Sequence, residues 1–260
     1  ALTWAINDNL TLKSTFTHSK NFQEDLRFYG PLTSESFNNG GSLPLGQRTN
    51  RDDHSYRLVN TLNYRKEWVD SKVDFLIGQE VSSAGGKSNF LRAENFRLSI
   101  TPEEVFANMQ FGDVDRIAGG VNTDTNRKSV FGRFDFNLQD KYIWTLTARA
   151  DQSSRFRGKN ALGIFPALAF AWKLDQENFL LNAEFIDQLK LRITYGETGN
   201  DRIPSGSTVN LFEGTTNRGP GFGNVDNIYY EPSSSSLYNP DLKWETTATS
   251  NIGLDFTMFS

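Results

Sequence analysis

The sequence has no cysteine and only two histidines among its 260 residues. Without cysteine it forms neither disulfides nor thiolate metal sites. His18 and His54 stand alone, without the spacing of metal ligands. No nucleophile elbow is present, and only an acid–base pair of carboxylates from separate loops stays open, because spacing alone does not test it. We therefore expect no catalytic residue, no metal and no cofactor.

Charge of one sign and long apolar runs are also scarce. The net charge of -4 lacks the basic footprint of a phosphate-binding surface, so no nucleic-acid partner is expected. No segment approaches the roughly 18 consecutive apolar residues that a transmembrane helix needs. This excludes a helical membrane protein but not a β-barrel, whose strands carry apolar residues only at alternate positions.

What the sequence does have is alternation, which is clearest between Val130 and Asp151. One face of this stretch is apolar and the other is mostly polar, and the pattern restarts after a polar interruption at 139–141. Period two on both sides of a short turn predicts an antiparallel hairpin. The apolar face carries Val130, Gly132, Phe134, Phe136, Leu138, Tyr142, Trp144, Leu146, Ala148 and Ala150, and the opposite face carries Phe131, Arg133, Asp135, Asn137, Ile143, Thr145, Thr147, Arg149 and Asp151.

Similar stretches recur and predict an all-β fold with about nine antiparallel strands. The expected strands are 1–7, 9–19, 53–66, 72–82, 128–139, 141–151, 162–174, 188–198 and 242–258, and the expected long loops are 20–52, 83–127, 152–161 and 199–241. Tight turns at one end of the sheet and long loops at the other are typical of an outer-membrane barrel. Because an odd strand count does not close and lipid does not tolerate open edges, we expect a fragment of a larger transmembrane β-barrel.

Tryptophan placement favours the same interpretation. Trp4, Trp68, Trp144 and Trp172 lie in or near the short-turn ends, and Trp244 lies at the long-loop end of its strand. Aromatic girdles at the two water–lipid boundaries have this placement, whereas a soluble β-sandwich tends to bury tryptophan in mid-strand.

Two groups of residues are candidates for binding. The first is expected to face the barrel lumen and contact a plug or a substrate, or else to form a solvated charge ladder. It consists of Arg133, Asp135, Arg149, Asp151, Lys243 and Glu245. The second group comprises aromatics of the last long loop, Phe212, Phe222, Tyr229 and Tyr230. They are expected to stack on sugar rings, to pack against a partner lipoprotein, or to pack within the loop itself.

Two local patterns are more specific. Thr101, Pro102 and Glu104 form a capping box with a first-turn proline, which predicts a short helix within the loop 83–127. Residues 122–126 read NTDTN, like the start of a calcium loop. They lack its glycine and its final glutamate, so the pattern favours an ordinary polar turn.

Several segments resemble the SusC/RagA family of TonB-linked outer-membrane receptors. In order along the chain they are GQE (78–80), FGRFD (131–135), DKY (140–142), ARAD (148–151), SSRF (153–156), FP (165–166), AW (171–172), LKLR (189–192), YG (195–196), TGN (198–200), NPDLKWETT (239–247) and NIGLD (251–255). Gln152 departs from the glycine usual at that position. Nothing resembles the family's plug, TonB-contacting segment or terminal strand.

The resemblance implies that residues 1–260 are part of a 22-stranded barrel without its plug domain. Its parent is expected to lie in the outer membrane of a Gram-negative bacterium, in contact with lipid. It would import an oligosaccharide or a peptide with a SusD-like surface lipoprotein, and it would reach TonB through the missing plug segment.

Two other functions remain open from the residues alone. A secreted β-rich module that binds carbohydrate would be soluble without detergent. An outer-membrane β-barrel enzyme would need a Ser/His or carboxylate constellation that the predicted strands do not show.

Overall fold

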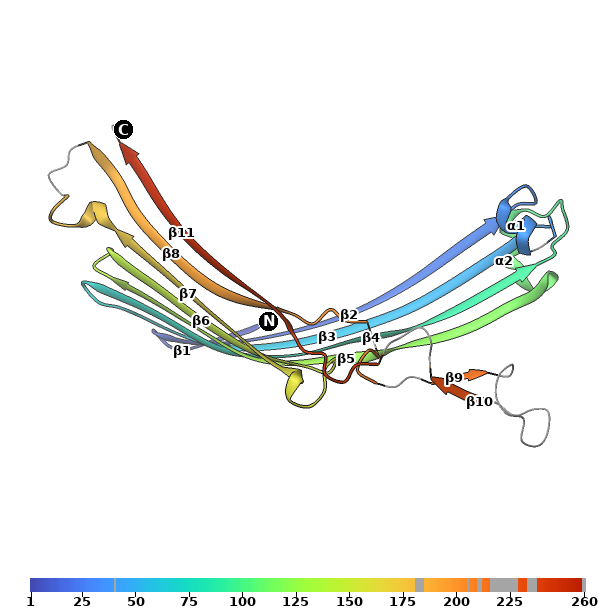
Figure 1. The fold of residues 1–260 in the computed structure, drawn as a ribbon, viewed down its shortest axis with the longest axis horizontal. Helices are drawn as coiled ribbons and strands as arrows, with labels where there is room; N and C mark the ends of the chain where they lie inside the picture. Colours follow the sequence, from blue (N-terminus) through green and yellow to red (C-terminus); the bar gives the residue numbers. More distant parts are fainter. Residues whose placement is uncertain are drawn as a thin grey trace. The chain divides into compact units, whose positions relative to one another are not determined.

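The computed structural model describes residues 1–39, 41–180, 185–204, 206–209, 212–215, 229–232 and 238–258. Within these ranges nine strands form one sheet in the order β1-β2-β3-β4-β5-β6-β7-β8-β11, and β9 pairs with β10 separately (Figure 1). The predicted all-β fold is thereby confirmed. In this part of the chain no ladder joins β1 to β11.

The strands of the sheet are β1 (Leu2–Asn7), β2 (Leu10–Tyr29), β3 (Leu45–Glu67), β4 (Ser71–Glu94), β5 (Asp113–Leu138), β6 (Tyr142–Ser153), β7 (Leu162–Lys173), β8 (Ile186–Asn200) and β11 (Glu245–Met258). The separate pair is β9 (Phe212–Thr215) and β10 (Tyr229–Pro232). The helices are α1 (Ser34–Asn39) and α2 (Pro102–Ala107), and the 3-10 turns are η1 (Met109–Phe111), η2 (Gly158–Ala161) and η3 (Leu174–Gln176). Over the described ranges, no helix has the length and apolar character needed to cross a membrane.

The chain divides into two compact units. The first unit contains Ala1–Phe16, Arg57–Ser82 and Thr125–Ser260, and the second contains Thr17–Tyr56 and Ser83–Asp124.

In the first unit, the predicted hairpin is β5 and β6. Its register pairs Phe134 with Leu146, and the turn places Gln139 and Asp140 at positive φ, as a tight connection between twisted strands requires. Lys141 donates its backbone N–H to the Leu138 carbonyl and closes the turn at 3.0 Å. The hairpin and its position are confirmed.

The two faces of the hairpin continue across β7, β8 and β11, because directly opposed residues in neighbouring strands lie on the same face. These strands run side by side in Figure 1. Directly opposed residues on the apolar face form the rows Leu138–Tyr142–Trp172–Leu191–Leu254 and Phe136–Trp144–Phe170–Ile193–Ile252. Several of these side chains are exposed, including Trp144, Ile252 and Leu254. The first unit thus presents a partly exposed apolar sheet face over five strands.

The second unit has its own hydrophobic core, formed by Ala93, Phe96, Val105 and Met109. Helix α2 supplies Val105, and it begins at the predicted capping box. Thr101 accepts the Glu104 backbone N–H at 3.3 Å, and the Glu104 carboxylate accepts the Thr101 backbone N–H at 3.1 Å. The predicted helix start is confirmed.

The predicted loops at 20–52 and 83–127 are wrong, because β2, β3, β4 and β5 continue far into them. In these stretches polar side chains occur on both faces, so the apolar alternation that marks a strand is missing. Ion pairs hold neighbouring strands there instead, such as Lys20 to Asp52 at 3.4 Å and Arg92 to Asp115. Residues 122–126, for which a polar turn is predicted, belong to β5.

Candidate functional site

The polar face of the first unit carries two ion-pair ladders. In the first ladder, Arg57 donates from Nε and Nη2 to the Glu80 carboxylate, both at 2.8 Å. Arg149 donates to Asp151 at 2.7 Å, to Ser129 at 2.8 Å and to Glu80 at 3.4 Å. The ladder therefore connects β3, β4, β5 and β6 across the sheet.

Aromatic packing supports this ladder. The Arg149 guanidinium lies over the Phe131 ring, 5.2 Å from its centroid. A Cβ atom on Gly78 would lie 2.5 Å from Cζ of the same ring. Glycine at this position lets Phe131 lie flat against the neighbouring strand, and the ring in turn supports the guanidinium.

The second ladder lies along the same face. Arg65 donates to Asp74 at 2.8 Å, and Arg133 donates to Asp135 at 2.6 and 3.0 Å. Asp135 also accepts the Thr145 hydroxyl at 2.6 Å. Of the residues predicted to face a lumen, Arg133, Asp135, Arg149 and Asp151 therefore share one face. Their contact with a plug or a substrate stays a prediction.

The last two residues of that group lie apart from the ladders. Glu245 begins β11 and accepts a hydrogen bond from the Asn200 side chain at 2.9 Å. Lys243 precedes the strand and is exposed. Which medium they face stays a prediction.

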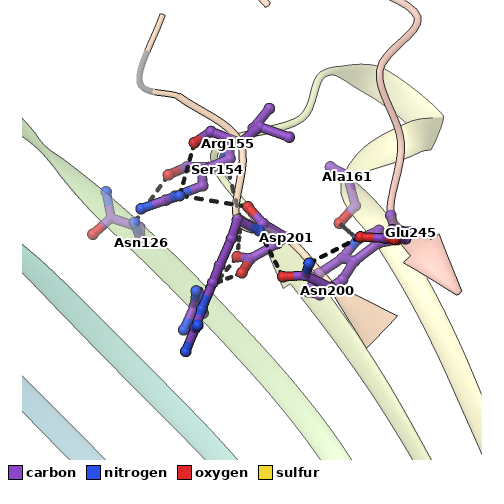
Figure 2. A network of polar contacts seen from close by, with 12 residues as sticks. Asn126, Ser154, Arg155, Ala161, Asn200, Asp201 and Glu245 are labelled. Atoms are coloured by element: carbon purple, nitrogen blue, oxygen red, sulfur yellow. Dashed lines mark hydrogen bonds and ion pairs between the residues drawn. The ribbon is translucent and has the colours of Figure 1, made fainter. Parts of the chain in front are cut away.

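Apart from the ladders, Asp201 lies in a network of polar contacts where several connections between strands meet (Figure 2). Its carboxylate is almost fully buried and accepts two hydrogen bonds from Arg127, at 2.8 and 2.6 Å, and one from the Ser153 hydroxyl at 2.9 Å. Arg155 donates to the backbone carbonyls of Asp201 at 3.5 Å and Ile203 at 2.9 Å. Paired hydrogen bonds from a guanidinium to a carboxylate fix both partners in orientation.

An aromatic cluster lies beside this carboxylate. Trp244 packs on Phe156 and Phe165, with ring centroids 5.6 and 5.3 Å apart, and donates its indole N–H to the Ala161 carbonyl at 3.0 Å. A Cβ atom on Gly199 would overlap the Phe165 ring, so glycine is needed there. We call Arg127, Ser153, Arg155, Phe156, Phe165, Asp201 and Trp244 the loop anchor.

The place of Trp244 corrects the sequence interpretation. Its position in the sequence predicted an aromatic girdle at a water–lipid boundary, with the indole on the apolar face. In the structure β11 begins only at Glu245, and Trp244 contacts Phe165, which opposes Arg149 and so belongs to the polar face. Trp244 precedes the residues of β11 that pair with β8, so the pleat of the sheet does not set the direction of its side chain. The half-buried indole packs within the loop anchor instead.

Sequence reasoning did not identify Asp201 and Arg127 as site residues. They are 74 positions apart, so no local period connects them. A signal was nevertheless present, because four of the resembling segments, SSRF (153–156), FP (165–166), TGN (198–200) and NPDLKWETT (239–247), lie in or next to the anchor.

At the other end of the strands, Glu177 connects aromatics of β6 and β7. It accepts the Tyr142 hydroxyl at 2.5 Å and the Trp172 indole N–H at 2.9 Å, and Lys141 lies 3.5 Å away. These hydrogen bonds from Tyr142 and Trp172 hold the pKa of Glu177 below its ordinary value. An aromatic pair with polar ends fixed in this way suits a boundary between apolar and aqueous surroundings.

The predicted ligand-binding aromatics are only partly placed. Phe212 lies in β9 opposite Pro232, and Tyr229 and Tyr230 lie in β10 opposite Thr215 and Gly214. Phe222 lies outside the described residues. Contact of these side chains with a ligand stays a prediction. Over the described ranges, His54 lies 3.3 Å from Asp124, and no group of three or more His, Asp or Glu residues is arranged to hold a metal ion.

Comparison with known proteins places the fold. A family model described as TonB dependent receptor-like, beta-barrel, matches residues 2–260. TonB-dependent receptor P3 of Formosa agariphila is 30% identical over 97% of this chain and 24% of the relative. TonB-dependent receptor SusC of Bacteroides thetaiotaomicron is 40% identical over 49% of this chain and 13% of the relative. The chain thus spans about a quarter or less of the length of these relatives.

A solved structure described as the RagAB peptide transporter has a similar fold. It superposes with a TM-score of 0.79 and 22% identity, over 99% of this chain and 27% of the solved chain. The same sheet therefore occurs within a longer protein.

Proposed function

Because this chain belongs to the TonB dependent receptor-like β-barrel family, we propose that it forms part of the wall of an outer-membrane receptor for nutrient uptake. The observation that carries the proposal is the division of the sheet in the first unit into an apolar face and a polar face. The apolar rows face lipid, and the ion-pair ladders face the barrel lumen.

Energetics support this assignment of the faces. A charged side chain facing the middle of a bilayer costs about 2–4 kcal/mol in a β-barrel. The ladder residues Arg57, Arg133 and Arg149, with their carboxylate partners, would multiply that cost if the faces were reversed. Exposed apolar residues such as Trp144 and Ile252 are unfavourable in water but favourable against acyl chains.

The proposed partners are those of the parent receptor. TonB supplies energy from the inner membrane, and a SusD-like surface lipoprotein delivers the ligand. The fold shared with the RagAB peptide transporter supports a peptide ligand, and the sequence similarity to SusC receptors supports an oligosaccharide. The loop aromatics and the residues of the ladders are the proposed contacts.

Uptake by the whole receptor tests this function. A strain that lacks the receptor gene is complemented with the full-length gene and given fluorescently labelled peptides from a protein digest, or labelled oligosaccharides from hydrolysed polysaccharide. We expect uptake of one of the two pools, and we expect it to be lost when TonB is deleted. Uptake of neither pool, or uptake that persists without TonB, would contradict the proposal.

A further inference from the structure

The connection between β8 and β11 is fastened to the connection between β6 and β7 at both of its ends. Near its start, the Thr208 hydroxyl donates to the Arg155 carbonyl at 2.9 Å. Near its end, the Asn160 side chain donates to the Asp241 carbonyl at 3.1 Å, and Trp244 is held by Ala161. The start and the end also meet each other, because the Asn239 N–H donates to the Ser207 carbonyl at 2.9 Å.

Asp201 is the central polar residue of this arrangement. Its side chain accepts three hydrogen bonds, and its backbone carbonyl accepts a fourth, from Arg155. The donors come from β5, from the end of β6 and from the residues after β6. Loss of the Asp201 charge therefore weakens the attachment of the start of the β8–β11 connection to β5 and to the end of β6, whereas the Arg155 hydrogen bonds to backbone carbonyls remain. Figure 2 shows Asp201 within this network of polar contacts, next to Arg155.

The fastened ends limit where β9 and β10 can lie. Phe212 follows the buried Thr208 by four residues, which span at most about 14 Å. On the return, Asn239 follows Pro232 by seven residues, which span at most about 25 Å. The β9–β10 pair is thus tethered on both sides, within these distances of Thr208 and Asn239.

We propose that Asp201 is a positioning residue for ligand capture, which it serves by fixing the two ends of the connection that carries the β9–β10 pair. The inference rests on the proposed uptake function. Asp201 does not touch the ligand in this account, and it acts through the backbone that it orders. Its replacement weakens capture while the barrel wall still assembles.

The test uses the full-length receptor with Asp201→Asn, which keeps the side-chain shape but removes the charge. The matched control is Asp255→Asn, which removes the carboxylate of an ion pair between β8 and β11. In that pair Arg192 donates to Asp255 at 2.6 Å, away from the loop anchor. Three quantities are measured. They are heat-modifiable migration as a measure of assembly, the rate of tryptic cleavage after Arg202 in outer membranes, and the concentration dependence of uptake of the labelled pools.

We expect Asp201→Asn to assemble normally, to be cleaved faster after Arg202, and to need about tenfold more ligand for half-maximal uptake at an unchanged maximal rate. Tenfold corresponds to the loss of about one charge-assisted hydrogen bond. Asp255→Asn should match the wild type in all three measurements. A residue with only a stabilising role in the wall would lower assembly and maximal uptake together and leave the half-saturating concentration unchanged.

The outcomes separate the two claims. Unchanged cleavage in Asp201→Asn overturns the anchor itself. Faster cleavage with an unchanged half-saturating concentration overturns the role in capture, as does a loss of assembly that Asp201→Glu does not restore. If the wild-type receptor takes up neither pool, the proposed function fails and the capture role fails with it, whereas the cleavage rates still decide whether the anchor exists.

Discussion

Leu146→Arg places a charge on the apolar face at the centre of the predicted hairpin. Leu146 lies opposite Phe134 on β5 and Leu168 on β7, and its side chain is about half exposed to the surroundings of the sheet. If those surroundings are lipid, the new guanidinium must leave water when the wall inserts. The ladder carboxylates do not reach the new guanidinium, because they are on the other side of the sheet.

The expected cost is about 2–4 kcal/mol, the penalty for arginine on the lipid face at mid-bilayer. It corresponds to a roughly 30- to 700-fold shift of the folding equilibrium. The neighbouring change Thr147→Arg places the same group on the polar face, opposite Arg133 and next to its partner Asp135. Repulsion from a like charge directly opposite is the main cost there, about 0.2–1 kcal/mol.

The assay is the yield of folded receptor in outer-membrane fractions of cells that express the full-length protein, read from heat-modifiable migration. We expect little folded Leu146→Arg and nearly normal Thr147→Arg. Equal folded yields of the two variants would refute the assignment of the faces. Soluble, unaggregated protein that needs no detergent would refute the membrane wall altogether.

Two further predictions concern segments that connect the strands. Because the hydrogen bonds from Tyr142 and Trp172 lower the pKa of Glu177, the stabilisation by its charged form is complete above the ordinary value of 4.5 and is lost as the pH falls from there through the lowered pKa. Glu177→Gln should therefore remove part of the difference between thermal unfolding at neutral and acidic pH, and an unchanged difference would contradict this reasoning. Thr101→Ala removes the capping box of α2 at a cost of about 1 kcal/mol. It should speed amide hydrogen exchange in α2 but not in β6. Equal exchange rates in α2 of the wild type and of Thr101→Ala would show that the cap contributes nothing.

The hairpin could be predicted because one face of each strand is apolar and the turn is short and polar. The same rule fails for β2 to β5 beyond the first unit, where Arg48 and Glu24 or Arg92 and Asp115 hold neighbouring strands by ion pairs. Polar residues on both faces leave no period to detect. Alternation also misled at Trp244, because the alternating pattern starts in the sequence before Glu245, where β11 and its pairing with β8 begin.

The loop anchor was out of reach of periodicity for a different reason. Its central pair, Arg127 and Asp201, joins residues that come together only when the four strands β5 to β8 have taken their order. Resemblance marked the segments around it, but it did not indicate that they meet or that Asp201 is the buried carboxylate among them. By contrast, the shared face of Arg133, Asp135 and Arg149 follows from their parity alone.

The most direct test of the central claim is the contact of β6 side chains with lipid, one position at a time. This chain has no cysteine, and any cysteine elsewhere in the full-length receptor is first replaced by serine. A cysteine introduced at 145, 146, 147 or 148 then gives the receptor a single thiol. Each variant is labelled with a fluorophore and placed in bilayers that contain brominated lipids, which quench on contact. We predict strong quenching at 146 and 148 and weak quenching at 145 and 147. Uniform quenching, or the reverse alternation, would contradict the account.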